Sequence, residues 1–193
     1  METVIARQPK RKTIIGLTLT ALFAALIAAG TFIAIPLPFS PVPIVLQNMF
    51  ALLAGLILGP LRGGAAVGLY LIAGAIGAPV FAGASGGVVR MLGPTGGFLL
   101  GYLLSALTAG FILGNPGRNK TSSPGRIILA VVAGLLIVYI PGVLWLKRSL
   151  DVSWIRALSA GFFPYLIGDA IKGLVAGIIL PRLRRAVADQ LYG

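Results

Sequence analysis

The sequence predicts an all-α membrane protein, in which one integral domain of 193 residues crosses the bilayer with six helices. Hydrophobic residues make up 58% of the chain and the mean hydropathy is +1.00. Charged residues make up only 10%, whereas a soluble domain carries about 25%. The apolar residues also fall into separate runs, most of them near the roughly 17–20 residues that a spanning helix needs. We therefore expect most of the surface to face lipid.

The six expected spans follow one another along the chain. They cover residues 14–35, 42–59, 64–77, 94–113, 127–146 and 161–180. The first follows basic residues, as a cleaved signal peptide would, but its length favours an uncleaved span. Four prolines between residues 36 and 43 predict a stiff link to the second run, since each fixes φ and removes a donor. The second and third runs are short and could instead form one broken or re-entrant unit.

The basic residues predict the orientation. If the N-terminus is cytoplasmic, eleven of the 16 Lys and Arg fall in cytoplasmic segments and four in external ones. Cytoplasmic segments of membrane proteins are enriched in these residues, so we expect both termini inside the cell. The net charge of +12 fits contact with anionic lipid headgroups. The cations do not form one stripe with interleaved aromatic residues, and nucleic acid is not an expected partner.

The composition excludes most chemistry. The chain has no His, no Cys and only four acidic residues, which removes the usual metal ligands and nucleophiles. It also lacks a Gly-x4-Gly-Lys-Ser/Thr loop for ATP. We expect no enzyme activity, no metal and no cofactor.

Two ionisable residues, Asp169 and Lys172, lie inside an expected span. Charged groups there are unfavourable unless they are paired or face a polar cavity. At a spacing of three residues the two side chains share a helix face. We expect them to be separated by a ligand, with the carboxylate accepting N–H groups and the ammonium meeting an anion. The alternative is a closed pair that only joins helices.

Three further polar residues are candidates for the same site. Gln47 and Asn48 lie in the second run, where helix–helix contact is an alternative role. Arg90 lies in the Gly-rich segment of residues 79–97. Irregular backbone at membrane depth survives where it lines a cavity. This segment could therefore fold over a pocket, or it could be an ordinary external loop with a solvated arginine.

Small residues recur at four-residue spacing along the first span. One row holds Ala21, Ala25 and Ala29, and a second holds Ala24 and Ala28. This spacing lets helices approach closely. It serves either internal packing or an external docking face.

Four strings resemble the BioY family, the biotin-specific substrate-binding (S) components of energy-coupling factor (ECF) transporters. They are residues 41–49 (PVPIVLQNM), 58–64 (LGPLRGG), 92–102 (LGPTGGFLLGY) and 164–172 (PYLIGDAIK). The resemblance implies a six-helix S-component fold in the cytoplasmic membrane of a prokaryote, with an external biotin pocket. It also implies a membrane-embedded coupling subunit and ATPase subunits as partners, and a homo-oligomer is compatible with it.

The resemblance also implies roles for individual residues. Asp169 and Lys172 would contact biotin, and the alanines of the first span would dock to the coupling subunit. A glycine-rich loop at residues 83–93 would close over the ligand, and Ser85 stands where some members carry Asn. Phe81 or Tyr165 could cover the bicyclic ring. The alternatives are another vitamin on the same scaffold, a passive channel or carrier, and a structural subunit.

Overall fold

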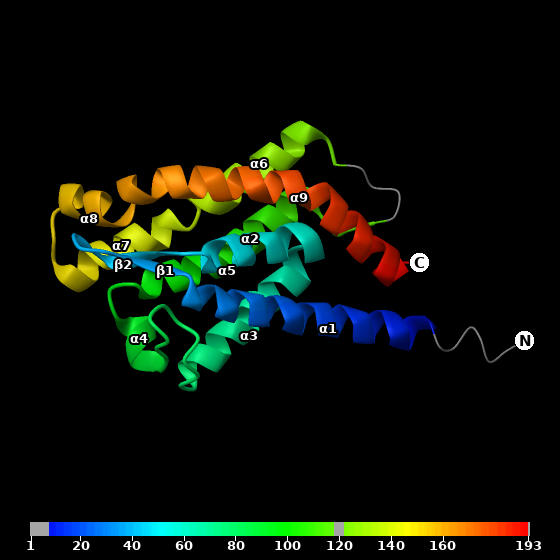
Figure 1. Ribbon diagram of the computed structural model, residues 1–193, viewed down its shortest axis with the longest axis horizontal. Helices are drawn as coiled ribbons and strands as arrows, with labels where there is room; N and C mark the ends of the chain where they lie inside the picture. The colour runs from blue at the N-terminus through cyan, green and yellow to red at the C-terminus, as the bar shows by residue number, and fades with distance from the viewer. Residues whose placement is uncertain (1–7, 118–121, 193) are drawn as a thin grey trace, which may run out of the picture.

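The computed structural model describes residues 8–117 and 122–192. It is a bundle of helices with one short hairpin (Figure 1). The α-helices are α1 (Gln8–Ala29), α2 (Gln47–Leu58), α3 (Pro60–Ala75), α4 (Val88–Leu92), α5 (Gly96–Leu113), α6 (Pro124–Leu136), α7 (Tyr139–Leu150), α8 (Trp154–Gly161) and α9 (Leu166–Tyr192). The remaining elements are the 3-10 turns η2 (Gly30–Phe32) and η3 (Phe163–Tyr165) and the strands β1 (Ala34–Leu37) and β2 (Ser40–Val45).

Helix α2 is the centre of the bundle, in contact with α1, α3, α5, α6 and α9. Ten of its 12 residues are buried. At about 1.5 Å per residue it is only ~18 Å long, which is less than the roughly 30 Å of a bilayer core. Because protein rather than lipid surrounds α2, its length does not have to match the bilayer.

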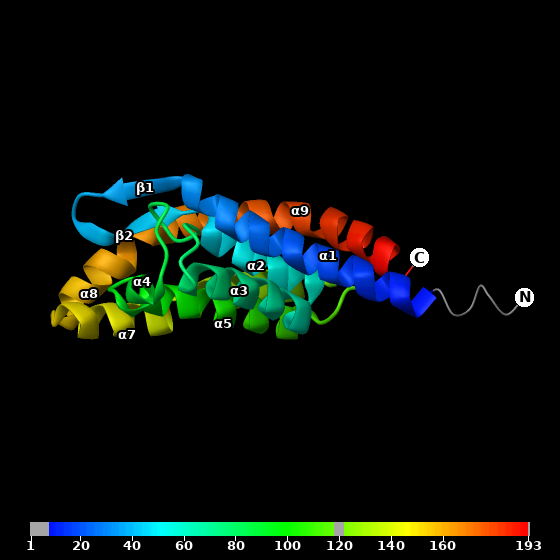
Figure 2. The ribbon, with the colours of Figure 1, turned by 90° about the horizontal axis from the view of Figure 1, so that it is seen from below.

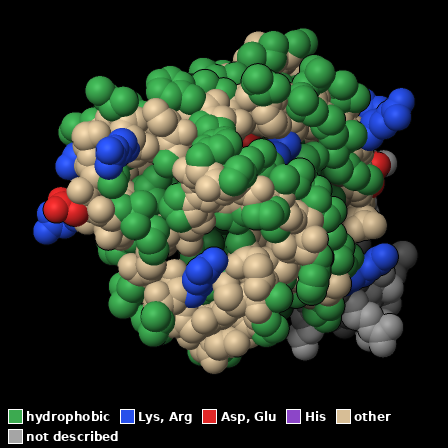
Figure 3. Space-filling view, turned by 60° about the vertical axis from the view of Figure 1, so that its left-hand side comes forward, with side chains coloured by type: hydrophobic (Ala, Val, Ile, Leu, Met, Phe, Trp, Pro, Cys, Tyr) green, Lys and Arg blue, Asp and Glu red, His purple; other side chains and the backbone are tan. Residues whose placement is uncertain are grey.

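The long helices lie side by side, so the molecule has two distinct ends. The described start of α1 and the end of α9 lie at one end (Figures 1 and 2). The β-hairpin, α4 and α8 lie at the other end in both views. The face in Figure 3 is largely hydrophobic, with basic side chains at a few separate places. Large hydrophobic side chains are also exposed along the long helices, among them Leu17, Ile128 and Ile178, in agreement with the expectation that most of the surface faces lipid.

Four helical stretches are long and apolar enough to cross a membrane within the described residues. They are Arg11–Phe32, Gly96–Leu113, Pro124–Leu150 and Trp154–Leu191. The fourth predicted span agrees closely with α5. The second and third predicted runs correspond to two separate helices, α2 and α3, which meet at Gly59. Its φ of 83° lies in the region that glycine adopts most readily.

Two predicted spans differ from the helices of the structure in their extent. The fifth run is divided between α6 and α7 at residues 137–138, because Pro141 cannot donate a hydrogen bond to the carbonyl of Ile137. The last run extends well past residue 180, since α9 continues through Pro181 to Tyr192. Arg7, Arg118 and Lys120, which contributed to the predicted orientation, lie outside the described residues.

The link between the first two predicted spans is a β-hairpin, which the sequence analysis did not foresee. Residues 34–45 form an antiparallel hairpin, with Ala34 opposite Val45 and an irregularity between Ile35 and Leu37. Proline disrupts central strands because it cannot donate to the ladder. In a two-stranded ribbon each strand has an outer edge where no donor is needed, so the prolines are tolerated.

Candidate binding site

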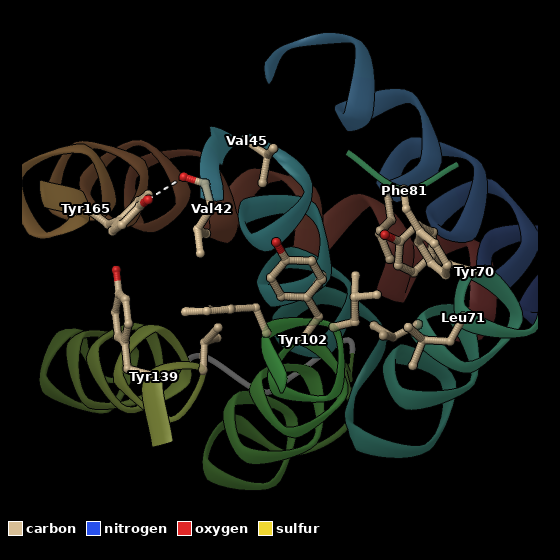
Figure 4. Close-up of a cluster of buried hydrophobic side chains, with 14 of the residues drawn as sticks. Val42, Val45, Tyr70, Leu71, Phe81, Tyr102, Tyr139 and Tyr165 are labelled. Carbon is tan, nitrogen blue, oxygen red and sulfur yellow. Dashed lines mark hydrogen bonds between the residues drawn. The ribbon is translucent and has the colours of Figure 1, made fainter. Parts of the chain in front are cut away.

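Two small adjoining cavities lie beneath the hairpin, with free volumes of about 30 and 20 Å³. Their shared walls come from β2 and α5: Val42, Pro43, Val45, Phe98 and Tyr102. Figure 4 shows the aromatic part of this region, with Tyr102 between the side of Tyr139 and Tyr165 and the side of Tyr70 and Phe81. A mostly apolar wall with a few polar groups is typical of a small-molecule site.

A buried polar cluster lies on the wall of the first cavity. Oδ1 of Asp169 accepts hydrogen bonds from Lys172 Nζ and Asn48 Nδ2, each at 2.9 Å. Its Oδ2 accepts the Tyr139 hydroxyl at 2.6 Å. Lys172 Nζ also donates to Asn48 Oδ1 at 3.0 Å. The charges are therefore closed into a pair here, where the sequence analysis expected a ligand to separate them.

The cluster does not use all of its hydrogen-bonding capacity. An ammonium has three donors and a carboxylate has about four acceptor positions. Lys172 uses two donors and Asp169 three acceptor positions, and the Asn48 amide donates once. One Lys172 donor, one Asn48 donor and one Asp169 acceptor position remain. The cluster can therefore accept one N–H group and donate twice to one carbonyl.

The second cavity has a different polar lining. Gln47, Arg90 and Thr95 lie on it, together with Phe81. Gln47 Nε2 donates to the Tyr70 hydroxyl at 3.0 Å and to the Val80 carbonyl at 2.8 Å, so both of its donors are occupied. Arg90 is exposed and makes one long contact, from Nη2 to the Ala82 carbonyl at 3.4 Å. Its guanidinium is consequently available to an anion.

The hairpin is fastened over these cavities by side-chain bonds. The Tyr165 hydroxyl donates to the Val42 carbonyl and lies 3.0 Å from Ser40 Oγ. Ser40 Oγ in turn donates to the Ala160 carbonyl at 2.6 Å. Tyr165 therefore both lines the first cavity and joins η3, the turn before α9, to β2.

Comparison with known proteins places this architecture in a family, since a profile of the BioY family matches residues 6–189. The chain belongs to the BioY family. Among its relatives, the biotin transporter BioY of Thermotoga maritima is 41% identical over 170 residues, which are 88% of this chain and 95% of that protein. The probable biotin transporter BioY of Pyrococcus horikoshii is 39% identical over 167 residues, or 86% and 94% of the two chains.

The fold of this BioY-family chain is also similar to a solved structure. The S-component for biotin from an ECF-type ABC transporter aligns with a TM-score of 0.81 and 32% sequence identity. The alignment covers 90% of this chain and 92% of that one. These findings confirm the resemblance drawn from the four sequence strings.

Most predicted site residues of the BioY-family chain lie on the two cavities. Asn48, Tyr165, Asp169 and Lys172 line the first, and Gln47, Phe81 and Arg90 line the second. Ser85 lies on neither lining. Its hydroxyl donates to the Ala82 carbonyl at 2.9 Å, and its backbone pairs with Phe81. The structure thus gives Ser85 a bond within the glycine-rich loop, and a contact of Ser85 with ligand stays a prediction.

Tyr102 and Tyr139 line the candidate site but were missed by the sequence analysis. Tyr139 donates to Asp169, and Tyr102 lines both cavities. The Tyr102 hydroxyl makes no hydrogen bond to any described residue, although the side chain is only 7% exposed. Tyrosines are common in apolar segments, so sequence alone gave no sign that these two face the pocket.

The structure separates the two alanine rows on α1. Ala21, Ala25 and Ala29 are exposed along one stripe, whereas Ala24 and Ala28 are half-buried and pack against the core. Only the first row is available to another protein. We call Ala21, Ala25 and Ala29 the outer alanine stripe.

Proposed function

We propose that this chain binds biotin from outside the cell and carries it across the cytoplasmic membrane of a prokaryote as the S component of an ECF transporter. Its relatives are named biotin transporters, and the similar solved structure is a biotin S-component. The family consists of transporters, in agreement with the expectation that the chain is not an enzyme. The observation that carries the proposal is the Asp169–Lys172–Asn48 cluster on the cavity wall.

The unused capacity of this cluster matches a ureido ring. Such a ring presents one carbonyl and two N–H groups. The carbonyl can accept from Lys172 and Asn48, and one N–H group can donate to Asp169. The oxygen of Tyr139, which donates its own proton to Asp169, retains acceptor capacity for the second N–H group. All four polar groups are then used at one end of the ligand.

This placement revises the expected division of labour between the two charges. The sequence analysis expected Asp169 to accept N–H groups and Lys172 to meet an anion, which in biotin would be the ureido ring and the carboxylate. Lys172 lies 2.9 Å from Asp169, so both belong to the same end of the ligand. The carboxylate of the valerate tail would instead bind Arg90, which lines the second cavity. The ring and tail would cross the shared apolar wall that contains Phe98 and Tyr102.

The distribution of basic residues between the two ends of the molecule supports a topology of six spans with both termini in the cytoplasm. We assign the spans to α1, α2, α3, α5, the α6–α7 pair and α9. Arg90 and Arg156 belong to α4 and α8, at the end opposite the termini, and Arg62, Arg182 and Arg185 belong to the terminal end (Figure 1). A cytoplasmic terminal end therefore agrees with the excess of basic residues expected there. The cavities beneath the hairpin would then open to the outside.

We further propose that the outer alanine stripe docks to a membrane-embedded coupling subunit. Small side chains allow a second helix to approach closely in lipid, and these three are exposed. Energy would come from ATPase subunits bound to that partner.

Titration of two proteins with two ligands tests the assignment of Arg90 to the biotin carboxylate. Wild-type protein and Arg90→Gln would each be titrated with biotin and with biotin methyl ester, which has no carboxylate. A hydrogen bond to a charged group contributes about 1.5–3 kcal/mol, so the variant should bind biotin about 10- to 100-fold more weakly. Its affinity for the ester should equal that of wild type. An equal loss for both ligands would contradict the assignment.

A further inference from the structure

A large open groove lies between α6 and α9, on a surface that the proposed biotin pathway does not use. Its volume is about 660 Å³, and every lining side chain except that of Ser122 is apolar. Several of these side chains extend into the surroundings, since Ile128, Leu174 and Ile178 are 62%, 66% and 67% exposed. In Figure 1 α6 lies on the opposite side of the bundle from α1, which carries the outer alanine stripe.

The groove is about as long, measured along α9, as one membrane leaflet is thick. On α9 its lining runs from Ala170 to Pro181. A rise of about 1.5 Å per residue makes this ~16 Å, and half of a bilayer core is about 15 Å. An acyl chain that lies along the groove would therefore reach from the headgroup level to the middle of the membrane.

Two arginines of α9 follow the groove at the end that lies nearer the chain termini. The lining residues of α9 form two rows at four-residue spacing, one through Gly173, Gly177 and Pro181 and one through Ala170, Leu174 and Ile178. The next position in the first row is Arg185, and in the second it is Arg182. Both arginines are exposed, and neither bonds or pairs with a described residue. Two free guanidinium groups thus follow the apolar lining directly.

We propose that this groove binds an anionic phospholipid, with one acyl chain between α6 and α9 and the phosphate against Arg182 and Arg185. Guanidinium groups bind phosphate oxygens with well-defined geometry. Neutral lipids share the chains but not the net negative charge, so the arginines would select the anionic headgroup.

The glycines of α9 determine where the groove can be blocked. A Cβ atom on Gly173 would lie 2.9 Å from Leu135 and 3.1 Å from Val131, so α6 closes the groove there. A Cβ atom on Gly177 would meet nothing within 4 Å. A side chain at position 177 therefore starts in open space, and leucine there is expected to occupy the groove. Gly68 on α3 is equally open and lies away from the groove, which makes it the matched control.

The test compares phosphatidylglycerol with phosphatidylcholine of the same acyl chains, added to purified protein in detergent. Bound lipid would be counted by native mass spectrometry. Each arginine near an anionic surface contributes about a fivefold change in affinity. We therefore expect Arg182→Gln/Arg185→Gln to bind phosphatidylglycerol about 30-fold more weakly than wild type and to show no preference between the lipids. Gly177→Leu should lose both lipids, and Gly68→Leu should behave as wild type.

Several results would overturn the proposal. Equal binding of the two lipids by wild-type protein would exclude a headgroup site at the arginines. Retention of lipid by Gly177→Leu would place the acyl chain elsewhere. If Gly177→Leu instead converts a dimer into a monomer, the groove is an interface between two copies of the chain. Biotin affinity measured on the same samples separates this test from that of the proposed function.

Discussion

The closed pair of Asp169 and Lys172 can be tested as a ligand site against a purely structural role with three variants. Lys172→Met and Asp169→Asn each remove one charge and keep a side chain of similar size. The double variant removes both charges. A structural pair and a ligand-binding pair predict different outcomes for the double variant, because neutralising both residues restores electrical balance but does not restore the contacts with biotin.

The structure sets the expected magnitudes. Both side chains are only 9% exposed, and loss of one partner of a buried pair costs about 3–5 kcal/mol of stability. Replacement of a whole buried pair by neutral groups is often without net effect, so the double variant should lie within about 1 kcal/mol of wild type. Two lost charge-assisted hydrogen bonds to biotin amount to about 3–6 kcal/mol, which is roughly 100- to 10,000-fold in affinity.

Two assays on the same preparations separate these effects. Thermal unfolding in detergent reports stability, and isothermal titration with biotin reports affinity. We expect the double variant to unfold near the wild-type temperature and still fail to bind. Lys147→Met is the matched control, since Lys147 lies 5.2 Å from the Trp154 ring centre and lines neither cavity. A double variant that binds biotin within tenfold of wild type would refute the ligand role of the pair.

Three further predictions concern other parts of the molecule. Tyr102→Phe should leave unfolding unchanged, because the Tyr102 hydroxyl bonds no described residue, and should weaken biotin about 2- to 12-fold in titrations if that hydroxyl donates to the ligand; unchanged affinity would exclude such a contact. Gly55→Ala should lower the unfolding temperature, since its Cβ would lie 2.1 Å from the Ala106 carbonyl oxygen and overpacking costs about 1–3 kcal/mol. Gly68→Ala, which meets nothing within 4 Å, is its control, and equal unfolding temperatures would contradict the packing argument. Ala25→Leu should keep full biotin affinity but no longer co-purify with a coupling subunit, and retained co-purification would exclude the outer alanine stripe as the docking face.

Much of the fold could be predicted because lipid imposes strong constraints on sequence. A long apolar run such as α5 has few alternatives to a helix in a membrane. The hairpin was missed because prolines at positions 36, 38, 41 and 43 disfavour strands in general, and the sequence does not reveal that this ribbon has only two strands. The break before α7 was missed because the run around Pro141 is continuously apolar, and hydropathy does not register a lost hydrogen bond.

The candidate site could be predicted where burial of a charge in lipid requires an explanation. Asp169 and Lys172 stood out on this ground, and Arg90 did because of its glycine-rich surroundings. Tyr102 and Tyr139 carry no such signal, since tyrosines are common in apolar membrane spans. The closed geometry of the pair was beyond sequence reasoning as well, because residues three apart on a helix can bond to each other or to a common ligand.

Direct titration of the purified wild-type protein with biotin tests the central claim most directly. The account predicts saturable binding of one biotin per chain, and competition by unlabelled biotin but not by vitamins that lack a ureido ring. Absence of saturable binding, or equal competition by an unrelated vitamin, would contradict the assignment of the Asp169–Lys172–Asn48 cluster to the ureido ring of biotin.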